Sequence, residues 1–416
     1  MITGKKNLQF GLIGGRLSHS FSPHIHAALA DYSYPLFELS ADELAKFVQR
    51  DELDGFNVTI PHKKAIIPYL DGISDEARKI GAVNTVVKDD NGKLIGHNTD
   101  YYGFDFLLKK GKIDVKGKHV LILGTGGASL TAIAVCKDMG ATKISCVSRT
   151  GDINYQNVYD VCADAQIIIN CTPVGMYPNN LSSPIELAKF KKCCGVVDMI
   201  YNPARTKLLL DAMSLGINCI GGLDMLTAQA KRACELFLGE HIDEFEIDRL
   251  TQKISASQSN IVLIGMPGCG KSTVAEHLSR ICGKDVLDTD KMIEQEACRS
   301  IPSIFAEDGE DFFRARESEA VALAGKQVSK IIATGGGVVT RSLNYAPLAQ
   351  NGTIVFIHRP ISELETLGRP LSHGADLDAM YQRRLPLYRL FCDVEVTNDT
   401  TPEECAEKII KILERN

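Results

Sequence analysis

The segment GMPGCGKS, residues 265–272, has the residue types and the spacing of a phosphate-binding loop. It fits the pattern GxxxxGK[ST], follows the apolar run NIVLI and precedes a helical pattern. In such a loop the backbone N–H groups surround the phosphates, the lysine reaches the outer phosphates and the hydroxyl coordinates Mg²⁺. The segment therefore predicts that ATP or GTP is bound by Gly265, Gly268, Cys269, Gly270, Lys271, Ser272 and Thr273.

A second glycine-rich turn, GTGGAS, follows the apolar run HVLIL and leads into a helical pattern with Leu130, Ile133 and Ala134 on one face. Strand, glycine turn, helix and strand form the unit that binds a dinucleotide pyrophosphate. The next strand, KISCV, ends at an arginine, which accommodates a 2′-phosphate and favours NADP over NAD. The residues predicted for this cofactor are Gly124, Gly126, Gly127, Ala128, Ser148, Arg149 and Thr150.

Three stretches upstream of this turn carry polar residues suited to a ketone reduction: HSFSPHIH (19–26), FNVTIPHKKA (56–65) and GAVNTVV…HNTDYYGF (81–104). Hydride delivery to a carbonyl carbon requires an acid that protonates the oxygen. Lys63 follows a strand and a proline, which could hold its amine at the mouth of a cleft. We predict that Lys63 and Asp100 form a catalytic pair, with Asp100 orienting the amine and binding a substrate hydroxyl.

The segments HSxSP, NVTxPxK, GAVNT and NTD, in this order before GxGGA, closely resemble shikimate dehydrogenase over residues 7–250. The resemblance implies NADPH-dependent reduction of 3-dehydroshikimate to shikimate. It implies substrate binding by Ser20, Ser22, Thr59, Asn84, Tyr201 and Gln229, and it places Asp75, Met199 and Gly222 near the nicotinamide half. The sequence departs from the family at Arg16, where proline is usual, at Ser148, which replaces a frequent asparagine, and at Asp152, where a second basic residue is common.

Downstream of the phosphate loop, the segments VLDTDKMIE, FFRARESE, ATGGGVV, GRPLS and RLPLYR follow in order. This set resembles shikimate kinase over about residues 260–416. The resemblance implies that Asp290 binds the 3-hydroxyl of shikimate and acts as its base, that Asp288 and Ser272 lie near Mg²⁺, and that Arg369 comes from a lid onto the transferring phosphoryl group. The shikimate ring and carboxylate would be bound by Asp290, Arg314, Gly335, Gly336, Gly337 and Arg384.

The expected fold class is α/β: a two-lobed dehydrogenase with a Rossmann-like NADP domain, joined to a P-loop, nucleoside-monophosphate-kinase-like domain with a parallel sheet. We expect a substrate lobe at 1–100, an NADP lobe at 101–229 and a helix at 230–250 that returns to the first lobe. The polar stretch 251–259, TQKISASQS, predicts a flexible linker before a kinase at 260–416. Such a linker would tether the two halves without forming a tunnel.

Composition restricts the class of protein. The 416 residues exceed one ordinary core, and the net charge of −6 argues against a broad nucleic-acid surface. No apolar run reaches the roughly 20 residues of a membrane span, and no secretory signal is visible. The 13 cysteines form no CxxC pair, so we expect reduced thiols, a cytoplasmic location and small-molecule substrates, with the oligomeric state left open.

Two alternative functions remain open. One is a quinate/shikimate dehydrogenase working with NAD and fused to a kinase, which Arg149 argues against. The other is a nucleotide-binding sensor with one inactive half, which would have no reason to keep Lys63, Asp100 and Asp290 together.

Cys269 lies inside the phosphate loop, where backbone amides at a helix N-terminus favour a thiolate. We therefore expect alkylating agents to inactivate the kinase and bound ATP to protect it. A buried, inert thiol is the alternative.

Overall fold

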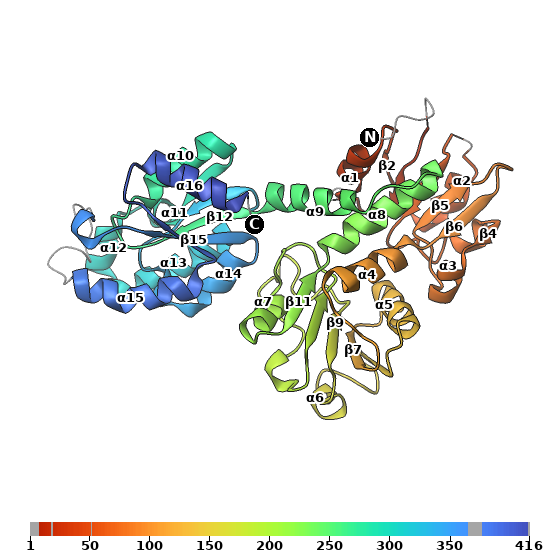
Figure 1. Cartoon of the computed structure of the whole chain (residues 1–416), viewed down its shortest axis with the longest axis horizontal. Helices are drawn as coiled ribbons and strands as arrows, with labels where there is room; N and C mark the ends of the chain where they lie inside the picture. The colour runs from red at the N-terminus through yellow and green to blue at the C-terminus, as the bar shows by residue number, and fades with distance from the viewer. Residues whose placement is uncertain (1–7, 18–19, 51, 365–376, 415–416) are drawn as a thin grey trace. The chain divides into compact units, whose positions relative to one another are not determined.

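The computed structural model describes residues 8–17, 20–50, 52–364 and 377–414. Contacts between Cα atoms divide the chain into two compact units, Met1–Ile254 and Ser255–Asn416. Strands and helices alternate in both units (Figure 1), so the predicted α/β class is confirmed. Each unit is described by itself below.

The first lobe of the first unit is built on a six-stranded mixed sheet of order β2-β1-β3-β5-β6-β4. Its strands are β1 (Leu12–Gly14), β2 (Leu36–Glu38), β3 (Gly55–Val58), β4 (Gly72–Ile73), β5 (Thr85–Lys88) and β6 (Leu94–His97). β1 pairs in parallel with β2 and β3, whereas β5 runs antiparallel to both β3 and β6. The helices of this lobe are α1 (Ser22–Leu29), α2 (Leu44–Val48) and α3 (Asp75–Ile80).

The second lobe has a parallel five-stranded sheet of order β11-β10-β9-β7-β8. The strands are β7 (His119–Leu123), β8 (Lys143–Val147), β9 (Ile167–Asn170), β10 (Gly195–Asp198) and β11 (Asn218–Gly221), and the helices are α4 (Thr99–Lys110), α5 (Gly127–Asp138), α6 (Val158–Val161) and α7 (Lys207–Ser214). Val120 and Ile122 pack in a cluster with residues of α4 and α5, whereas Leu121 and Leu123 pack with residues of α6 and α7. Helices therefore cover both faces of the sheet, which explains why its strands read as continuous apolar runs.

The residues of α5 differ in burial, and Ile133 of the predicted face packs against the core. Ala132 and Val135 are fully buried, whereas Leu130 and Ile133 are only partly buried. Small side chains lie where the helix packs against the sheet, because close helix–strand packing in this unit leaves little room there.

Two further helices, α8 (Leu223–Leu238) and α9 (Phe245–Gln258), close the first unit. Ala230 and Cys234 of α8 and Leu250 of α9 form one apolar cluster with Ile25 and Leu29 of α1. The end of this unit therefore packs on the first lobe. The single helix expected at 230–250 is instead two helices, because Gly239, with φ +67, ends α8.

The expectation of a flexible linker at 251–259 is wrong, because α9 continues to Gln258. The Thr251 hydroxyl lies 2.7 Å from that of Thr227 on α8. At the other end, Lys284 Nζ donates to the carbonyl oxygens of Ala256 (2.9 Å) and Ser259 (2.6 Å), which satisfies acceptors at the end of the helix. Tertiary contacts thus stabilise a helix in a segment with no apolar periodicity.

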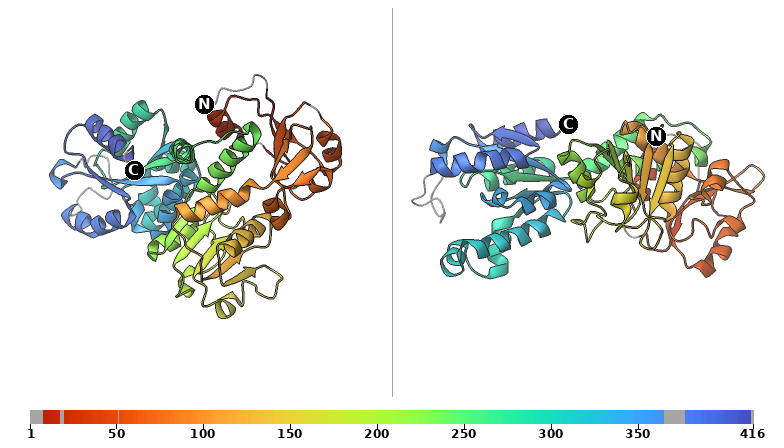
Figure 2. Two further views of the ribbon diagram at one scale, coloured as in Figure 1. Left: turned by 45° about the vertical axis from the view of Figure 1, so that its right-hand side comes forward. Right: turned by 90° about the horizontal axis from the view of Figure 1, so that it is seen from below.

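The second unit, coloured from green to blue in Figure 2, has a parallel sheet of order β13-β14-β12-β15-β16. The strands are β12 (Asn260–Ile264), β13 (Asp285–Asp288), β14 (Lys330–Ala333), β15 (Gly352–His358) and β16 (Val394–Thr397). The helices are α10 (Lys271–Cys282), α11 (Thr289–Ala297), α12 (Ile301–Glu307), α13 (Gly309–Gly325), α14 (Tyr345–Ala349), α15 (Leu377–Phe391) and α16 (Pro402–Leu413). β12 lies at the centre of the sheet and leads directly into the phosphate loop.

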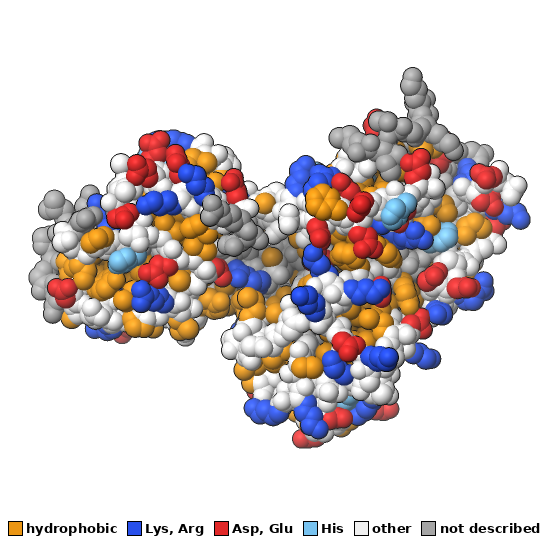
Figure 3. All heavy atoms as spheres, viewed as in Figure 1, with side chains coloured by type: hydrophobic (Ala, Val, Ile, Leu, Met, Phe, Trp, Pro, Cys, Tyr) orange, Lys and Arg blue, Asp and Glu red, His pale blue; other side chains and the backbone are white. Residues whose placement is uncertain are grey.

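Lysine, arginine and acidic side chains are interspersed over the face of the molecule drawn in Figure 3, without a broad area of one sign. None of the helices in the described part of the chain is long and apolar enough to span a lipid bilayer. All 13 cysteines are free thiols.

Candidate active sites

The first unit contains a cleft of about 670 Å³ lined by residues of both lobes. Twelve of the residues predicted for the dehydrogenase half line it: Ser20, Ser22, Thr59, Lys63, Asn84, Asp100, Gly127, Ala128, Met199, Tyr201, Gly222 and Gln229. They come from segments spread between residues 20 and 229, and the fold brings them to one place. The predicted catalytic and substrate-binding residues of this half therefore share a single cavity.

Lys63 and Asp100 form an ion pair in this cleft. Lys63 Nζ donates to Asp100 Oδ2 at 2.6 Å, and the side chains are 27% and 17% exposed. Lys63 lies five residues after the end of β3, and its carbonyl oxygen accepts from Val83 N at 2.8 Å. Asp100 lies in the first turn of α4, where the helix dipole stabilises a carboxylate. The two groups are held at the cleft from different elements and still reach the solvent.

Asn84 is held rigidly beside this pair. Its Oδ1 accepts from Thr99 N at 2.7 Å, and its Nδ2 donates to Thr99 Oγ1 at 3.1 Å. Asn57, which the sequence analysis did not select, also lines the cleft, and its Nδ2 donates to Thr85 Oγ1 at 2.9 Å. Asn57 lies on β3, two residues before Thr59, which follows the strand. This spacing is a signal that could have identified Asn57, because alternate residues of an extended segment share a face.

The glycine turn before α5 fits a pyrophosphate. Gly124 has φ +104, and a Cβ there would lie 3.0 Å from Thr172 Cγ2. A Cβ at Gly126 or Gly127 would meet nothing within 4 Å, and no side chain caps the helix. The outer face of the turn is thus open, and the first N–H groups of α5 are available to an anion.

The residues predicted for the 2′-phosphate lie at the end of β8. Arg149 and Thr150 are exposed and Ser148 is partly buried. None of the three lines the cleft described above. Asp75 is the first residue of α3 and is exposed, and it does not line the cleft either.

Asp198, another residue that the sequence did not point to, lies buried at the end of β10, next to Met199, which lines the cleft. It accepts from Thr206 Oγ1 at 2.7 Å, from Ile200 N at 3.0 Å and from Asn170 Nδ2 at 3.0 Å. Burial raises the pKa of Asp198 to about 6, against the effect of these hydrogen bonds. The bond to Ile200 N fixes the backbone between Met199 and Tyr201, so Asp198 positions the cleft wall.

The second unit contains a cleft of about 660 Å³. The predicted residues that line it are Gly268, Gly270, Lys271, Ser272, Thr273, Asp288, Asp290, Arg314, Gly335, Gly336, Gly337 and Arg384. Gly265 and Cys269 are not among its lining residues, and Arg369 lies outside the described residues. The cleft is also lined by Glu294, Glu317 and Arg359, for which the sequence analysis proposed no role.

The phosphate loop connects β12 to α10 through left-handed glycines. Gly268 and Gly270 have φ of +84 and +93, and a Cβ at Gly270 would lie 2.9 Å from Asn398 Nδ2. Lys271 Nζ donates across the loop to the carbonyl oxygens of Gly265 (2.9 Å) and Met266 (3.0 Å). No side chain caps α10, so its first N–H groups are available to phosphate oxygens.

The expected accessible thiol at Cys269 is not what the structure has. Cys269 is 0% exposed, and its Sγ would lie 2.9 Å from a Cβ at Gly265. Within the loop, Lys271 Nζ lies 3.8 Å from Cys269 Sγ. The structure therefore favours the alternative of a buried thiol.

Ser272 and Asp288 provide a pair of oxygen ligands at the base of the loop. Ser272 Oγ donates to Asp288 Oδ2 at 3.0 Å, and Asp288 Oδ1 accepts from the backbone N–H groups of Asp290 and Lys291. Among the described residues, no group of three or more histidine, cysteine, aspartate and glutamate side chains could hold a metal. Such a sparse oxygen set fits Mg²⁺, which usually binds one or two protein oxygens together with substrate phosphates and waters.

Asp290 lies deeper in the same cleft, close to Gly335 and Glu317. A Cβ at Gly335 would lie 2.7 Å from both Asp290 Oδ1 and Glu317 Oε1, and neither oxygen has a hydrogen-bond partner among the described residues. Burial raises the pKa of Asp290 to about 6, and the carboxylates of Asp288 and Glu317 act in the same direction. Asp290 therefore suits the role of a base near neutral pH.

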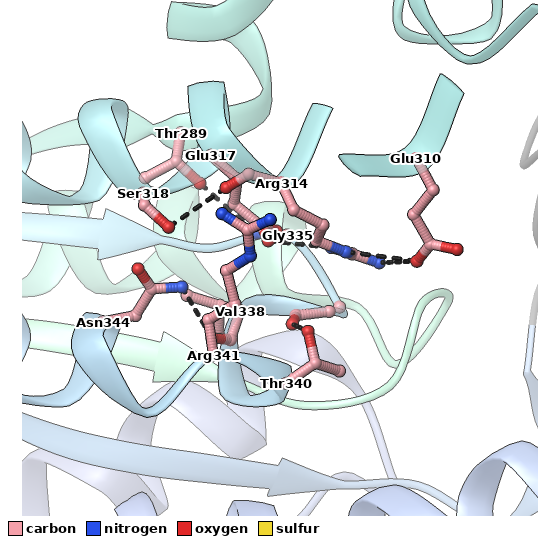
Figure 4. Close-up of polar contacts among 12 residues, drawn as sticks. Thr289, Glu310, Arg314, Glu317, Ser318, Gly335, Val338, Thr340, Arg341 and Asn344 are labelled. Atoms are coloured by element: carbon pink, nitrogen blue, oxygen red, sulfur yellow. Dashed lines mark hydrogen bonds and ion pairs between the residues drawn. The ribbon is translucent and has the colours of Figure 1, made fainter. Parts of the chain in front are cut away.

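Two arginines, Arg314 and Arg384, complete this part of the cleft, and Figure 4 shows the contacts of Arg314. Arg314 Nη1 donates to the fully buried Glu317 Oε2 at 2.8 Å, and Nη2 donates to Glu310 Oε1 at 3.1 Å. A Cβ at Gly337 would lie 2.0 Å from Arg314 Nη1, so the guanidinium packs directly on this glycine. Arg384 Nη1 donates to Gly336 O at 3.1 Å. Gly337 thus leaves room for Arg314, and the carbonyl oxygen of Gly336 accepts a hydrogen bond from Arg384.

Comparisons with known proteins cover both units. A model of the shikimate dehydrogenase substrate binding domain matches residues 12–86, and a model of shikimate kinase matches residues 267–414. The shikimate dehydrogenase (NADP(+)) of Clostridium beijerinckii is 38% identical over 263 residues, which are 58% of this chain and 95% of that protein.

Solved structures agree with this match. A chorismate mutase/shikimate 5-dehydrogenase fusion protein from Clostridium acetobutylicum has a TM-score of 0.57 at 35% identity, with 60% of this chain and 98% of the other covered. A shikimate dehydrogenase in complex with NADP⁺ has a TM-score of 0.54 at 31% identity, with 61% and 97% covered. The chain therefore belongs to the shikimate dehydrogenase family and carries a shikimate kinase domain at its C-terminal end.

Proposed function

We propose that this chain catalyses two consecutive reactions: reduction of 3-dehydroshikimate to shikimate with NADPH, and phosphorylation of the 3-hydroxyl of shikimate with ATP. We assign the first reaction to residues 1–250 and the second to residues 260–416. The observation that supports the proposal most directly is that the catalytic and substrate-binding residues implied by the two resemblances converge on one cleft in each unit.

In the first cleft, Lys63 donates a proton to the carbonyl oxygen as the ketone is reduced, and Asp100 orients the amine and binds a ring hydroxyl. Bound NADPH supplies the hydride. Gly124, Gly126, Gly127 and Ala128 would hold its pyrophosphate, Ser148, Arg149 and Thr150 its 2′-phosphate, and Asp75, Met199 and Gly222 would lie near its nicotinamide. Ser20, Ser22, Thr59, Asn84, Tyr201 and Gln229 bind the hydroxyls and the carboxylate of the substrate.

In the second cleft, Asp290 accepts the proton of the 3-hydroxyl. Arg314 and Arg384 bind the substrate carboxylate, since a guanidinium can bind both carboxylate oxygens, and Glu317 holds Arg314 in place. Bound ATP with Mg²⁺ supplies the phosphoryl group. The phosphate loop would hold the nucleotide, and Ser272 and Asp288 would hold the metal.

The test uses the purified full-length chain. With 3-dehydroshikimate and NADPH alone, we expect shikimate to form; with Mg²⁺ and ATP added, we expect shikimate 3-phosphate, identified by mass. Oxidation of quinate with NAD in preference to the first reaction would support the quinate/shikimate dehydrogenase alternative. If only one of the two reactions occurs, the result would support the alternative of a nucleotide-binding sensor with one inactive half.

We also propose a cytoplasmic location, which the 13 free cysteines support, because disulfides rarely form in reducing compartments.

A further inference from the structure

Arg16 lines the cleft of the first unit, at a position where the family usually has proline. Its backbone is fixed from both sides. Gly15 N donates to Ile60 O at 2.9 Å, and Leu17 N donates to Glu38 Oε1 at 2.7 Å. A Cβ at Gly15 would lie 3.1 Å from Pro61 Cδ, so the Arg16 loop lies close against the segment that leads to Lys63. The backbone that carries the Arg16 side chain is thus fixed beside the cleft.

The charges of the cleft do not balance. Among its described lining residues, only Arg16, Lys63 and Asp100 carry charge. Lys63 and Asp100 neutralise each other at 2.6 Å. Arg16 is exposed and makes no ion pair or side-chain hydrogen bond with any described residue. Among the residues that the structure describes, none neutralises this positive charge in the cleft.

We propose that Arg16 binds the carboxylate of the substrate, and that it determines the preference of the first site for an anionic ring. This inference rests on the proposed reduction of 3-dehydroshikimate. Ser20 and Ser22, which follow Arg16 in the sequence and line the same cleft, provide only neutral hydroxyl donors. A guanidinium adds a charge-assisted contact, which is roughly twice as strong as a neutral hydrogen bond.

The phosphates of the cofactor are the competing anions. Arg16 belongs to the first lobe and follows β1, whereas the pyrophosphate turn before α5 and the residues Ser148–Thr150 belong to the second lobe. Ser20 and Ser22, which line the same cleft as Arg16 and belong to the same lobe, are two of the residues proposed to bind substrate. These neighbours favour the substrate carboxylate over the cofactor.

The test compares Arg16→Gln, Arg16→Lys and Lys64→Gln in the full-length chain, each with 3-dehydroshikimate and with its uncharged carboxamide. Lys64 is the matched control, because it is an exposed cation of the same lobe that does not line the cleft. We expect Arg16→Gln to raise the KM for 3-dehydroshikimate about tenfold or more, with little change in the KM for NADPH. Wild type and Arg16→Gln should use the carboxamide equally well, Arg16→Lys should recover part of the loss, and Lys64→Gln should match wild type.

Three outcomes overturn the inference while leaving the proposed function intact. They are an unchanged KM for 3-dehydroshikimate in Arg16→Gln, an equal loss on the carboxamide, and a rise confined to the KM for NADPH. An unchanged thermal unfolding midpoint shows that Arg16→Gln is folded. A wild-type chain that does not reduce 3-dehydroshikimate at all overturns the proposed function and this inference together.

Discussion

Lys63 Nζ and Asp100 Oδ2 lie 2.6 Å apart, although 37 residues separate them in the sequence. The pair remains partly exposed to a cleft lined by other polar residues. If the pair had only a structural role, breaking it would leave the rate of ketone reduction unchanged. If Lys63 is the proton donor, removing its amine must lower that rate.

Lys63→Ala should therefore lower kcat for 3-dehydroshikimate reduction by about 10²- to 10⁴-fold, the usual contribution of general acid catalysis. Loss of NADPH absorbance measures this rate. Kinase activity of the same variant should equal that of wild type, and Lys64→Ala should retain both activities. A Lys63→Ala enzyme within threefold of wild type would exclude Lys63 as the proton donor.

The pKa of Asp290, about 6, predicts the pH dependence of the kinase. The base must be deprotonated to accept the hydroxyl proton, so kcat/KM for shikimate should rise with pH through about 6 and level off above it. Asp290→Asn should abolish the activity at every pH while leaving reduction intact. The measurement is kcat/KM for shikimate at saturating ATP and Mg²⁺ between pH 5 and pH 8, and a flat profile over this range would contradict the assignment.

Gly337→Ala should disturb shikimate binding in the kinase. The new Cβ would lie 2.0 Å from Arg314 Nη1, so the guanidinium must move away from its bonds to Glu317 and Glu310. We expect the KM for shikimate to rise about tenfold to a hundredfold, as for the loss of a charged hydrogen bond, with a smaller change in the KM for ATP.

Gly283→Ala is the control for Gly337→Ala. Gly283 ends α10 with φ +70, and a Cβ there meets nothing within 4 Å. This variant should lower the thermal unfolding midpoint through backbone strain and leave both KM values unchanged. If Gly337→Ala behaves in the same way, Arg314 does not hold the substrate.

Arg149→Gln should reduce the preference for NADPH. Arg149 is exposed at the end of β8, where it is proposed to hold the 2′-phosphate, a group that NADH lacks. We expect kcat/KM for NADPH to fall about tenfold and that for NADH to change little. Lys116→Gln, an exposed lysine before β7, should change neither. Equal losses with the two cofactors would remove Arg149 from the proposed 2′-phosphate site.

Much of the fold could be predicted because its signals are local. The run HVLIL and the turn GTGGAS encode a strand and a tight turn within eleven residues, and the structure has β7 and α5 there. The helix through Thr251–Gln258 could not be predicted, because Thr227 and Lys284, which stabilise it, are distant in the sequence.

The residues of the candidate sites also divide into those that a local motif identifies and those that only the tertiary structure brings together. The phosphate loop is a contiguous motif, so Lys271 and Ser272 could be selected from the sequence. The approach of Glu317 to Asp290 and Gly335 depends on how α13 packs on α11, and no local pattern encodes it. Asp198 was missed for a related reason, since its role is to hold the backbone at Ile200 and not to contact a ligand.

Cys269 illustrates how access decides reactivity. A position in the phosphate loop favours a thiolate, but the thiol is 0% exposed, and only an opened loop would admit an alkylating agent. Cys194 and Cys298 are exposed. We expect iodoacetamide to label these two first, as measured by peptide mass mapping, and to leave kinase activity intact in wild type and in Cys269→Ala alike. Three results together would show instead that the loop opens readily and that Cys269 is reactive, as the sequence alone suggested. They are a rapid loss of kinase activity as Cys269 is labelled, protection by ATP, and the absence of this loss in Cys269→Ala.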